Sequence, residues 1–360
     1  MVNEDRLIKT LFELVRIDSP SGEEQAMAND LKDRLQSLGF DVGLDGYGNV
    51  IGKLGNDDAI LLSAHMDTVE PGRGINPRVD GVTVVSEDST ILGGDCKAGI
   101  AAILEGLTAA LESGVSLKSV EVAFTRQEEI GLIGARNLDF SRIDSKNAVV
   151  FDGEGPPTQI TSSSPTHVSF DIEVTGRAAH AGVEPEKGLS SIRVSSELIV
   201  RLPQGRIDDE TTFNIGVING GSVTNAVPEK TMIRGEFRSH NPMTMNNLSS
   251  DVNNAIEDVK ELFPEARLDL TMNTQFESYS IAESDPAVDL LATAYGVLGQ
   301  GFTMLPSGGG TDGNVFRMHG INAAVVGMAD HNAHTVREYV SIPELVNAAE
   351  LCEVLVRVSV

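Results

Sequence analysis

The segment Ala59-Ile-Leu-Leu-Ser-Ala-His-Met-Asp67 decides the fold. Its first six residues are almost all apolar, which is typical of a strand buried on both faces of a sheet. Similar apolar runs occur at residues 120–124 and 147–151, and a helical pattern spans residues 97–111. Buried strands that alternate with helices predict an α/β fold with a mostly parallel sheet and helices on both faces.

The flanking sequence predicts a second domain. Upstream, Ser21-Gly-Glu-Glu24 is typical of a capping box and predicts a helix that ends at Gly39. Downstream, residues 167–175 alternate between polar and apolar, which predicts a strand with one face in water. The first pattern returns with a buried run at residues 323–326. We predict an α/β domain formed by residues 1–165 and 278–360, and an inserted α+β domain formed by residues 166–277.

Acidic residues outnumber basic ones: 53 Asp and Glu against 27 Lys and Arg give the 360-residue chain a formal net charge of −26. This charge repels phosphate backbones and anionic membranes, so we expect neither nucleic acid nor a membrane as partner. Two cysteines, Cys96 and Cys352, are too few for a disulfide framework. The N-terminal segment lacks the apolar core of a signal peptide, and no stretch reaches the ~20 apolar residues of a membrane span. We therefore expect a cytoplasmic protein.

Polar side chains follow three of the predicted strands. His65 and Asp67 come directly after the first strand. Glu128 and Glu129 come shortly after the second, and Asp152 directly after the third. The carboxyl ends of parallel strands meet at one edge of a sheet, where α/β proteins form their binding crevice. We expect these five side chains to lie at that edge.

Two further segments could reach the same edge. Asp95 stands among glycines at the start of the helical pattern; alone it would be interpreted as an N-cap, but beside the strand-end cluster it becomes a candidate ligand. His331 and His334 follow the buried run at 323–326, and either could approach the cluster.

Histidine with several carboxylates is a ligand set suited to Zn²⁺, Mn²⁺ or Co²⁺. Carboxylates gathered in one place repel each other unless a cation neutralises them. Their number suits two ions roughly 3.5–4 Å apart that share one carboxylate, and it leaves a glutamate free to act as a general base on water.

Seven motifs, taken in order, resemble the M20 family of di-zinc metallopeptidases, nearest its peptidase T-like (tripeptidase) branch. The resemblance spans nearly the whole chain, and it implies that the α/β domain is catalytic and that the inserted domain is a lid that pairs two chains into a homodimer. The motifs are His65-x-Asp67, Gly94-Asp95-x-Lys97-x-Gly99, Glu128-Glu129, Asp152-Gly, His180-Ala-Gly, Ser307-Gly-Gly-Gly-Thr-Asp312 and His334-Thr.

The resemblance implies two Zn²⁺ ions that share Asp95, with Mn²⁺ or Co²⁺ as other metals the ligands would accept. Glu128 matches the general base, and Asp67 the carboxylate that orients a ligating imidazole. The family also has a cis peptide bond after the shared aspartate. The implied ligands are His65, Asp95 and Asp152 for one ion, and Asp95, Glu129 and His334 for the other.

In the inserted domain, His180 matches a histidine that stabilises the developing oxyanion, usually in the partner's active site. The plain interpretation is a solvated loop residue. Other positions match substrate-binding residues of the family, although alone they would be interpreted as turn or surface residues. A guanidinium suits a peptide carboxylate, which it binds bidentately. The substrate-binding positions are Asn225, Arg238, Gly309, Gly310 and Thr311.

Two positions leave alternatives open. Cys96, where much of the family has another residue, is either a metal ligand or a buried spectator. His331 competes with His334, whose His-Thr-x-x-Glu context matches the family, so we interpret His331 as a loop residue.

We expect a metallopeptidase, specifically a di-zinc exopeptidase that cleaves short peptides as a tripeptide aminopeptidase. The alternative within the family is an N-acyl amino acid deacylase or a dipeptidase. A non-catalytic metal-binding or peptide-binding protein would have no need of Glu128. A nucleotide-binding α/β protein would need a glycine-rich loop where His65-Met-Asp67 stands.

Overall fold

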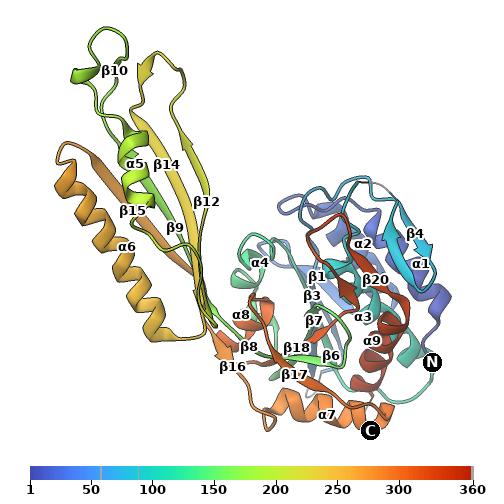
Figure 1. The fold of residues 1–360 in the computed structure, drawn as a ribbon. Helices are drawn as coiled ribbons and strands as arrows, with labels where there is room; N and C mark the ends of the chain where they lie inside the picture. Colours follow the sequence, from blue (N-terminus) through green and yellow to red (C-terminus); the bar gives the residue numbers. More distant parts are fainter. Residues whose placement is uncertain (57–58, 88, 358–360) are drawn as a thin grey trace. The chain divides into compact units, whose positions relative to one another are not determined.

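The computed structural model describes residues 1–56, 59–87 and 89–357, which fall into two compact units (Figure 1). The first unit comprises Met1–Ser163, Ser280–Ser307 and Thr311–Val360, and the second comprises Ser164–Tyr279 with Gly308–Gly310. The second unit thus begins two residues before the predicted inserted domain and ends two residues after it.

Gly308–Gly310 belong to the second unit, whereas the prediction placed them in the first domain. Ser164 Oγ donates a hydrogen bond to the Gly309 carbonyl at 2.9 Å. The ring of Phe276 lies so close to Gly310 that a Cβ there would approach the ring Cζ to 2.2 Å. These contacts hold the three glycines to the second unit.

The first unit is built on a nine-stranded sheet of order β1-β2-β6-β3-β7-β18-β8-β16, with β17 paired to β8. The central pairs β6/β3, β3/β7 and β7/β18 are parallel, and every residue of β3 and β6 is buried. The predicted α/β class with a mostly parallel sheet is therefore confirmed. The strands are β1 (Asp41–Leu44), β2 (Val50–Leu54), β3 (Ile60–His65), β6 (Val120–Thr125), β7 (Asn147–Gly153), β8 (Gln159–Ser164), β16 (Tyr279–Ser280), β17 (Thr303–Pro306) and β18 (Asn322–Gly327).

Helices cover both faces of this sheet. A Cβ at Gly99 in α3 would meet Phe151, whereas one at Gly313 in α8 would meet Val150. Neighbouring residues of a strand point to opposite faces, so α3 and α8 lie on opposite sides. The helices are α1 (Glu4–Val15), α2 (Gln25–Ser37), α3 (Gly94–Glu112), α4 (Ile133–Arg136), α7 (Pro286–Leu298), α8 (Asp312–Met318) and α9 (Ile342–Leu355), with a 3-10 turn at Phe140–Arg142.

The capping-box prediction is wrong. Helix α2 begins at Gln25, and its N-cap residue Glu24 makes no side-chain cap. Ser21 Oγ instead donates a hydrogen bond to Asp67 Oδ2 at 2.6 Å, and the Glu24 carboxylate accepts the backbone N–H of Gln127. The Glu24 carboxylate also accepts the backbone N–H of Gly22 at 2.7 Å, so it keeps a local contact, whereas the Ser21 hydroxyl is bound to a distant residue.

A small antiparallel sheet, of order β19-β20-β5-β4, also belongs to the first unit. The sequence did not predict it because its strands are short and lack apolar runs. It pairs the chain around residues 330–341 with an early hairpin. The strands are β4 (Pro77–Asp80), β5 (Thr83–Ser86), β19 (Asp330–His331) and β20 (Tyr339–Ser341).

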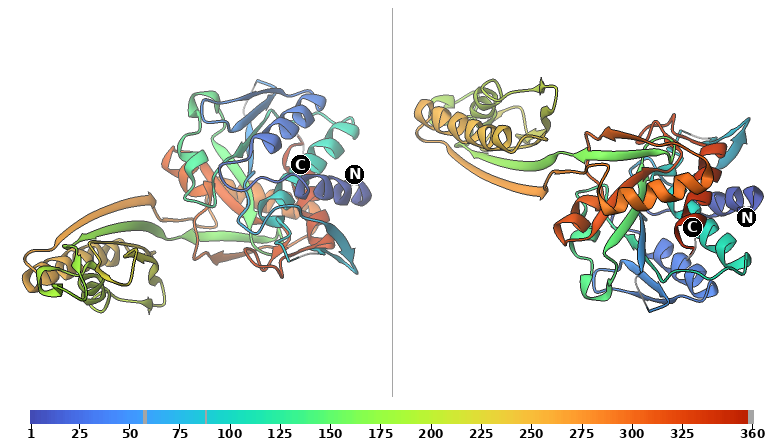
Figure 2. Two further views of the ribbon diagram at one scale, coloured as in Figure 1. Left: turned by 90° about the horizontal axis from the view of Figure 1, so that it is seen from above. Right: turned by 90° about the horizontal axis from the view of Figure 1, so that it is seen from below.

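The second unit is a five-stranded antiparallel sheet of order β11-β12-β14-β9-β15, with α5 and α6 packed on it (Figures 1 and 2). Its core includes the rings of Phe170, Phe213 and Phe237. A separate two-stranded ribbon joins β10 and β13. The elements are β9 (Thr166–Thr175), β10 (Ala179–His180), β11 (Gly205–Asp208), β12 (Thr211–Gly220), β13 (Ala226–Val227), β14 (Lys230–Ser239), β15 (Arg267–Phe276), α5 (Ser191–Ile199), α6 (Pro242–Leu262) and a 3-10 turn at Pro185–Lys187.

Among the described residues, none of the helices combines the length and the apolar character that crossing a membrane requires.

Candidate metal centre

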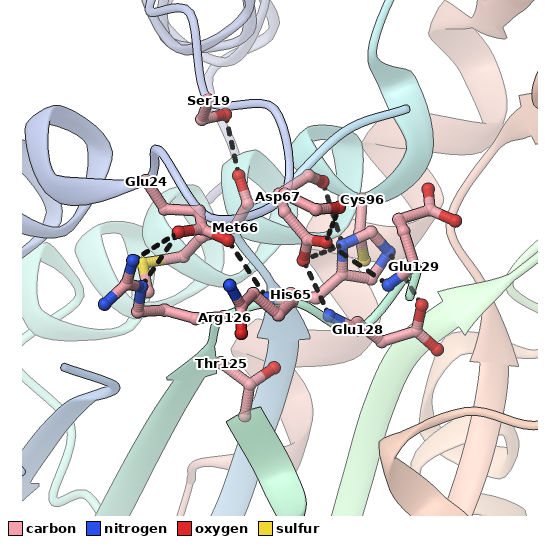
Figure 3. Close-up of polar contacts among 12 residues, drawn as sticks. Ser19, Glu24, His65, Met66, Asp67, Cys96, Thr125, Arg126, Glu128 and Glu129 are labelled. Carbon is pink, nitrogen blue, oxygen red and sulfur yellow. Dashed lines mark hydrogen bonds and ion pairs between the residues drawn. The ribbon is translucent and has the colours of Figure 1, made fainter. Parts of the chain in front are cut away.

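The strand ends bring the predicted residues of the first unit together, and Figure 3 shows His65, Asp67, Glu128 and Glu129 among them. β3 ends at His65, and β7 carries Asp152 near its end. Glu128 and Glu129 follow β6 in the turn before α4. Asp95 lies at the start of α3, where its backbone is not helical and its peptide bond to Cys96 is cis.

The His65 side chain is buried, and both of its ring nitrogens have polar contacts that fix the orientation of the ring. Its Nδ1 lies 3.0 Å from the backbone carbonyl of Asp67 and 3.4 Å from the Asp67 carboxylate. Its Nε2 lies 3.0 Å from Asp95 Oδ1 and 3.4 Å from Asp152 Oδ1. A hydrogen bond at Nδ1 fixes the tautomer that leaves Nε2 free to ligate. The imidazole is thus aimed at the two carboxylates.

Asp67 also binds the turn that carries Glu128 and Glu129, a contact that the sequence did not predict. Its carboxylate accepts the backbone N–H groups of Glu128 at 2.9 Å and Glu129 at 3.2 Å (Figure 3). It also accepts the hydroxyl of Ser21 at 2.6 Å. The side chain therefore fixes the turn that presents both glutamates. Its pKa is lowered, against the effect of burial, by its contacts with His65 and Ser21.

Potential ligand atoms form two groups that share Asp95. The atoms within each group lie within 4.8 Å of one another. His334 Nε2 lies 3.3 Å from Asp95 Oδ2 and 3.0 Å from Glu129 Oε2. The groups are His65, Asp95, Cys96 and Asp152, and Asp95, Glu129 and His334.

The electrostatics of the centre suit a cation. Burial, followed by the charge of Asp95, raises the pKa of Glu129 to about 7. Burial also raises the pKa of Asp152. Hydrogen bonds to Asp95 and Glu129 raise the pKa of His334 to about 10. Crowded buried carboxylates with imidazole nitrogens between them fit divalent ions such as Zn²⁺.

Glu128 lies beside the groups but belongs to neither. Its Oε2 is 4.0 Å from His65 Nε2, and the side chain is buried. Burial, with the nearby charge of Asp152, raises its pKa well above the usual range. Glu128 is thus close to the candidate ligands without supplying an atom to either group, a position compatible with a general base.

Cys96 and His331 differ from these residues. The Cys96 thiol donates to the Phe151 carbonyl at 2.8 Å, and burial raises its pKa well above the usual range. Metal ligation needs the thiolate. His331 Nε2 pairs with Glu344 Oε2 at 2.7 Å, and its ring stacks on Tyr339.

In the second unit, His180 lies in β10 of the β10/β13 ribbon, and Asn225 immediately precedes β13. His180 is exposed and pairs with Ala226, while the backbone N–H of Ala181 donates to the Asn225 carbonyl at 3.0 Å. The His180 Nδ1 accepts the N–H of Gly182 at 3.2 Å, so the Nε2–H remains as a donor.

The other candidate substrate residues have local partners. Arg238 in β14 contacts Glu236 through Nε and Nη2, and its Nη1 lies 3.4 Å from the Gly308 carbonyl. Thr311 caps α8: its hydroxyl accepts the N–H of Gly313 at 3.1 Å. Each residue is thus held by its own unit.

Sequence reasoning gave no role to two buried carboxylates near the centre. Asp312, the last residue of the Ser307–Asp312 motif, accepts a hydrogen bond from the Thr125 hydroxyl, and burial raises its pKa to about 7. Glu338 accepts backbone N–H groups from the segment that carries Asp95. The motif context of His334 contained Glu338, but no sequence pattern predicted this contact.

The fold and the centre together define the class of metallohydrolases. Comparison with known proteins gives the family. The profile of the M20 peptidase dimerisation domain matches residues 163–263, and that of peptidase family M28 matches residues 49–154.

Relatives cover almost the whole chain. The uncharacterized protein YqjE of Bacillus subtilis is 36% identical over 98% of this chain and 97% of its own length. The crystal structure of aminopeptidase PepT from Bacillus cereus is 34% identical, covers 99% of this chain and 98% of its own, and superposes with a TM-score of 0.84. A tripeptidase from Staphylococcus aureus, 30% identical with the same coverage, gives 0.89. The chain belongs to the peptidase T-like branch of the M20 metallopeptidase family.

Proposed function

We propose that this peptidase is a cytoplasmic di-zinc exopeptidase that removes the N-terminal residue of short peptides, with tripeptides as its main substrates. One observation carries the proposal: Asp95 belongs to both ligand groups, while Glu128 stands beside them without belonging to either. A site that held one structural ion would need neither the shared carboxylate nor the spare one.

The five ligands are divided as the resemblance implied. His65, Asp95 and Asp152 would hold one ion, and Asp95, Glu129 and His334 would hold the other, without the Cys96 thiol. When bound there, divalent cations lower the pKa of water and polarise the peptide carbonyl.

The chain's own residues move the proton. Glu128 takes it from the attacking water and delivers it to the leaving amine. The Asp67 carboxylate keeps Glu128 in place by accepting its backbone N–H at 2.9 Å. The backbone carbonyl and the carboxylate of Asp67 also face His65 Nδ1. One carboxylate thereby orients the base and a ligand together.

We also propose that the second unit pairs two chains into a homodimer. β11 pairs with β12 over Thr211–Phe213, so the rest of β12 is an edge of the sheet. Ile218 and Val217 on this edge are 49% and 42% exposed. An exposed edge strand with apolar residues is a template for pairing with another chain.

The remaining residues contact the substrate in this proposal. The His180 Nε2–H stabilises the oxyanion in the partner's site, because a donor aimed at that charge acts most strongly in the transition state. Arg238 binds the peptide carboxylate. The other substrate contacts are assigned to Asn225, Gly309, Gly310 and Thr311.

A substrate panel tests the function. Protein reconstituted with Zn²⁺, Mn²⁺ or Co²⁺ is assayed against tripeptides with a free amino group, against dipeptides and against N-acetyl amino acids. Release of the N-terminal residue from tripeptides, with little turnover of the other two classes, supports the proposal. Preference for N-acetyl amino acids would make the protein a deacylase, and preference for dipeptides a dipeptidase.

A further inference from the structure

The segment that presents Asp95 is held by a carboxylate from far along the chain. Glu338 Oε2 accepts the backbone N–H groups of Leu92 at 2.6 Å and Gly93 at 2.8 Å, and its Oε1 accepts that of Asp95 at 3.1 Å. Glu338 is 3% exposed, so these hydrogen bonds are shielded from water. One side chain thus fixes three backbone groups of the segment.

The backbone packs tightly against this carboxylate. A Cβ on Gly94 would lie 2.4 Å from Asp330 Oδ1, 2.6 Å from Val340 Cγ2 and 3.2 Å from Glu338 Oε1. Gly93 has a φ of +71°, a conformation that glycine adopts without strain. Glycine at these two positions lets the Asp95 segment rest directly on Glu338 and Asp330.

The same carboxylate lies four residues after His334. The Glu338 N–H donates to the Thr335 carbonyl at 3.0 Å, which closes a turn between the two side chains. His334 has a φ of +63°, and Asn332 has a φ of +58°. Non-glycine residues persist in this conformation where their surroundings determine it strongly. Asp95 and His334 are therefore tied together through one short segment.

We infer that Glu338 is a positioning residue of the metal centre: it sets the place of the shared ligand Asp95 relative to His334. The inference rests on the proposed two-metal function. Partners of ligating residues commonly change metal affinity 10–100-fold when they are removed, because an unsupported ligand must be ordered by the ion itself. Glu338 acts through the backbone of the segment that carries Asp95.

Three substitutions in the 360-residue chain test this role. Glu338→Ala removes all three acceptor contacts, whereas Glu338→Gln keeps one oxygen and turns an amide toward the remaining N–H. Gly94→Ala displaces the segment and leaves Glu338 in place. Co²⁺ binding is followed by its visible absorption spectrum, and Zn²⁺ affinity by competition with a chromophoric chelator.

We expect Glu338→Ala to weaken binding of at least one ion by about 10–100-fold. Glu338→Gln and Gly94→Ala should shift the affinity in the same direction, with an altered Co²⁺ spectrum. If the Glu338→Ala variant fails to fold, the metal affinities of the Glu338→Gln and Gly94→Ala variants test the inference.

Glu121 supplies a matched control. It is a buried glutamate of the first unit that accepts the backbone N–H groups of Asp144 and Ser145, near the start of β6. Glu121→Gln should lower the melting temperature of the metal-free protein and leave metal affinity unchanged. If it weakens metal binding as much as Glu338→Gln, general destabilisation explains the effect and the inference is overturned.

The outcomes separate the inference from the proposed function. A wild-type protein that binds fewer than two ions contradicts the two-metal proposal itself. A wild-type protein that binds two ions, together with Glu338 and Gly94 variants that bind them equally tightly and with the same spectrum, overturns the role of Glu338 alone.

Discussion

The two units hold their candidate residues in different ways. In the first, His65, Asp67 and Asp152 are almost excluded from solvent, and each makes several polar contacts within the unit. In the second, His180 is exposed, and Arg238 contacts Glu236 and a carbonyl. The first set is held by several contacts of its own fold, whereas the roles that we propose for the second set involve a substrate or a partner chain.

The pKa values of the carboxyl groups also differ between the two units. In the first unit, burial raises the pKa values of Glu129 and Asp152, and the nearby charge of Asp95 raises them further. In the second unit, Glu236 lies between His167 and Arg238, and its hydrogen bonds to them lower its pKa to about 2. The carboxylate-rich groups of the first unit are the ones that we propose to hold divalent ions.

Asp95→Ala should have the largest effect of any single change. It removes one ligand from both ions and leaves the other carboxylates repelling each other. We expect metal content, measured by elemental analysis, to fall well below two ions per chain and activity to fall to background. A variant that keeps two ions would show that Asp95 is not shared.

Glu128→Gln should separate binding from turnover. The amide has the shape of the carboxylate but cannot accept the proton, so kcat should fall by about 10²–10⁴-fold while both ions stay bound. Glu129→Gln is the comparison: it should lose metal as well as activity. Loss of metal from the Glu128 variant would make Glu128 a ligand and reverse our assignment of the pair.

His180→Ala tests whether a residue of the second unit affects turnover without affecting metal binding. We expect both ions to remain and kcat to fall by about 10²–10³-fold, with a smaller change in KM, because a donor to the oxyanion is lost. If His180 acts in the partner's site, a mixed dimer with the Glu128→Gln chain has one intact site. Activity of the mixture should then rise toward half the wild-type value per mixed dimer. No rise despite demonstrated exchange would place His180 in its own chain's site or outside catalysis.

Glu236→Gln should have the smallest effect and should act on stability. Because folding lowers the Glu236 pKa from 4.5 to about 2, its contribution is fully present above pH 4.5 and is lost as the pH falls toward 2. The variant should melt at a lower temperature than wild type at pH 7, and the difference should shrink in acid. Glu173→Gln, which removes an exposed ion pair with Lys230 on the same sheet, should change the melting temperature less. A difference that grows in acid would contradict this account.

Much of the first unit could be predicted because its signals are local. The runs around β3, β6 and β7 are apolar enough to predict buried strands, and strand ends place polar residues at one edge. The capping box at Ser21 failed because the hydroxyl found a stronger partner in Asp67 Oδ2, 46 residues away in sequence.

What could not be predicted depends on contacts between distant segments. Glu338 reaches the Asp95 segment across 243 residues, and no spacing in the sequence encodes that contact. Gly308–Gly310 joined the second unit because Phe276 and Ser164 contact them. In the second unit the ribbon that pairs His180 with Ala226 is two residues long on each side, too short to leave a periodic signal.

Anomalous diffraction from crystals grown with Zn²⁺ tests the central claim most directly. Our account predicts two peaks per chain on either side of Asp95, one ligated by His65, Asp95 and Asp152 and the other by Asp95, Glu129 and His334. A single peak, or ligation by the Cys96 sulfur or by His331 in place of His334, would contradict it.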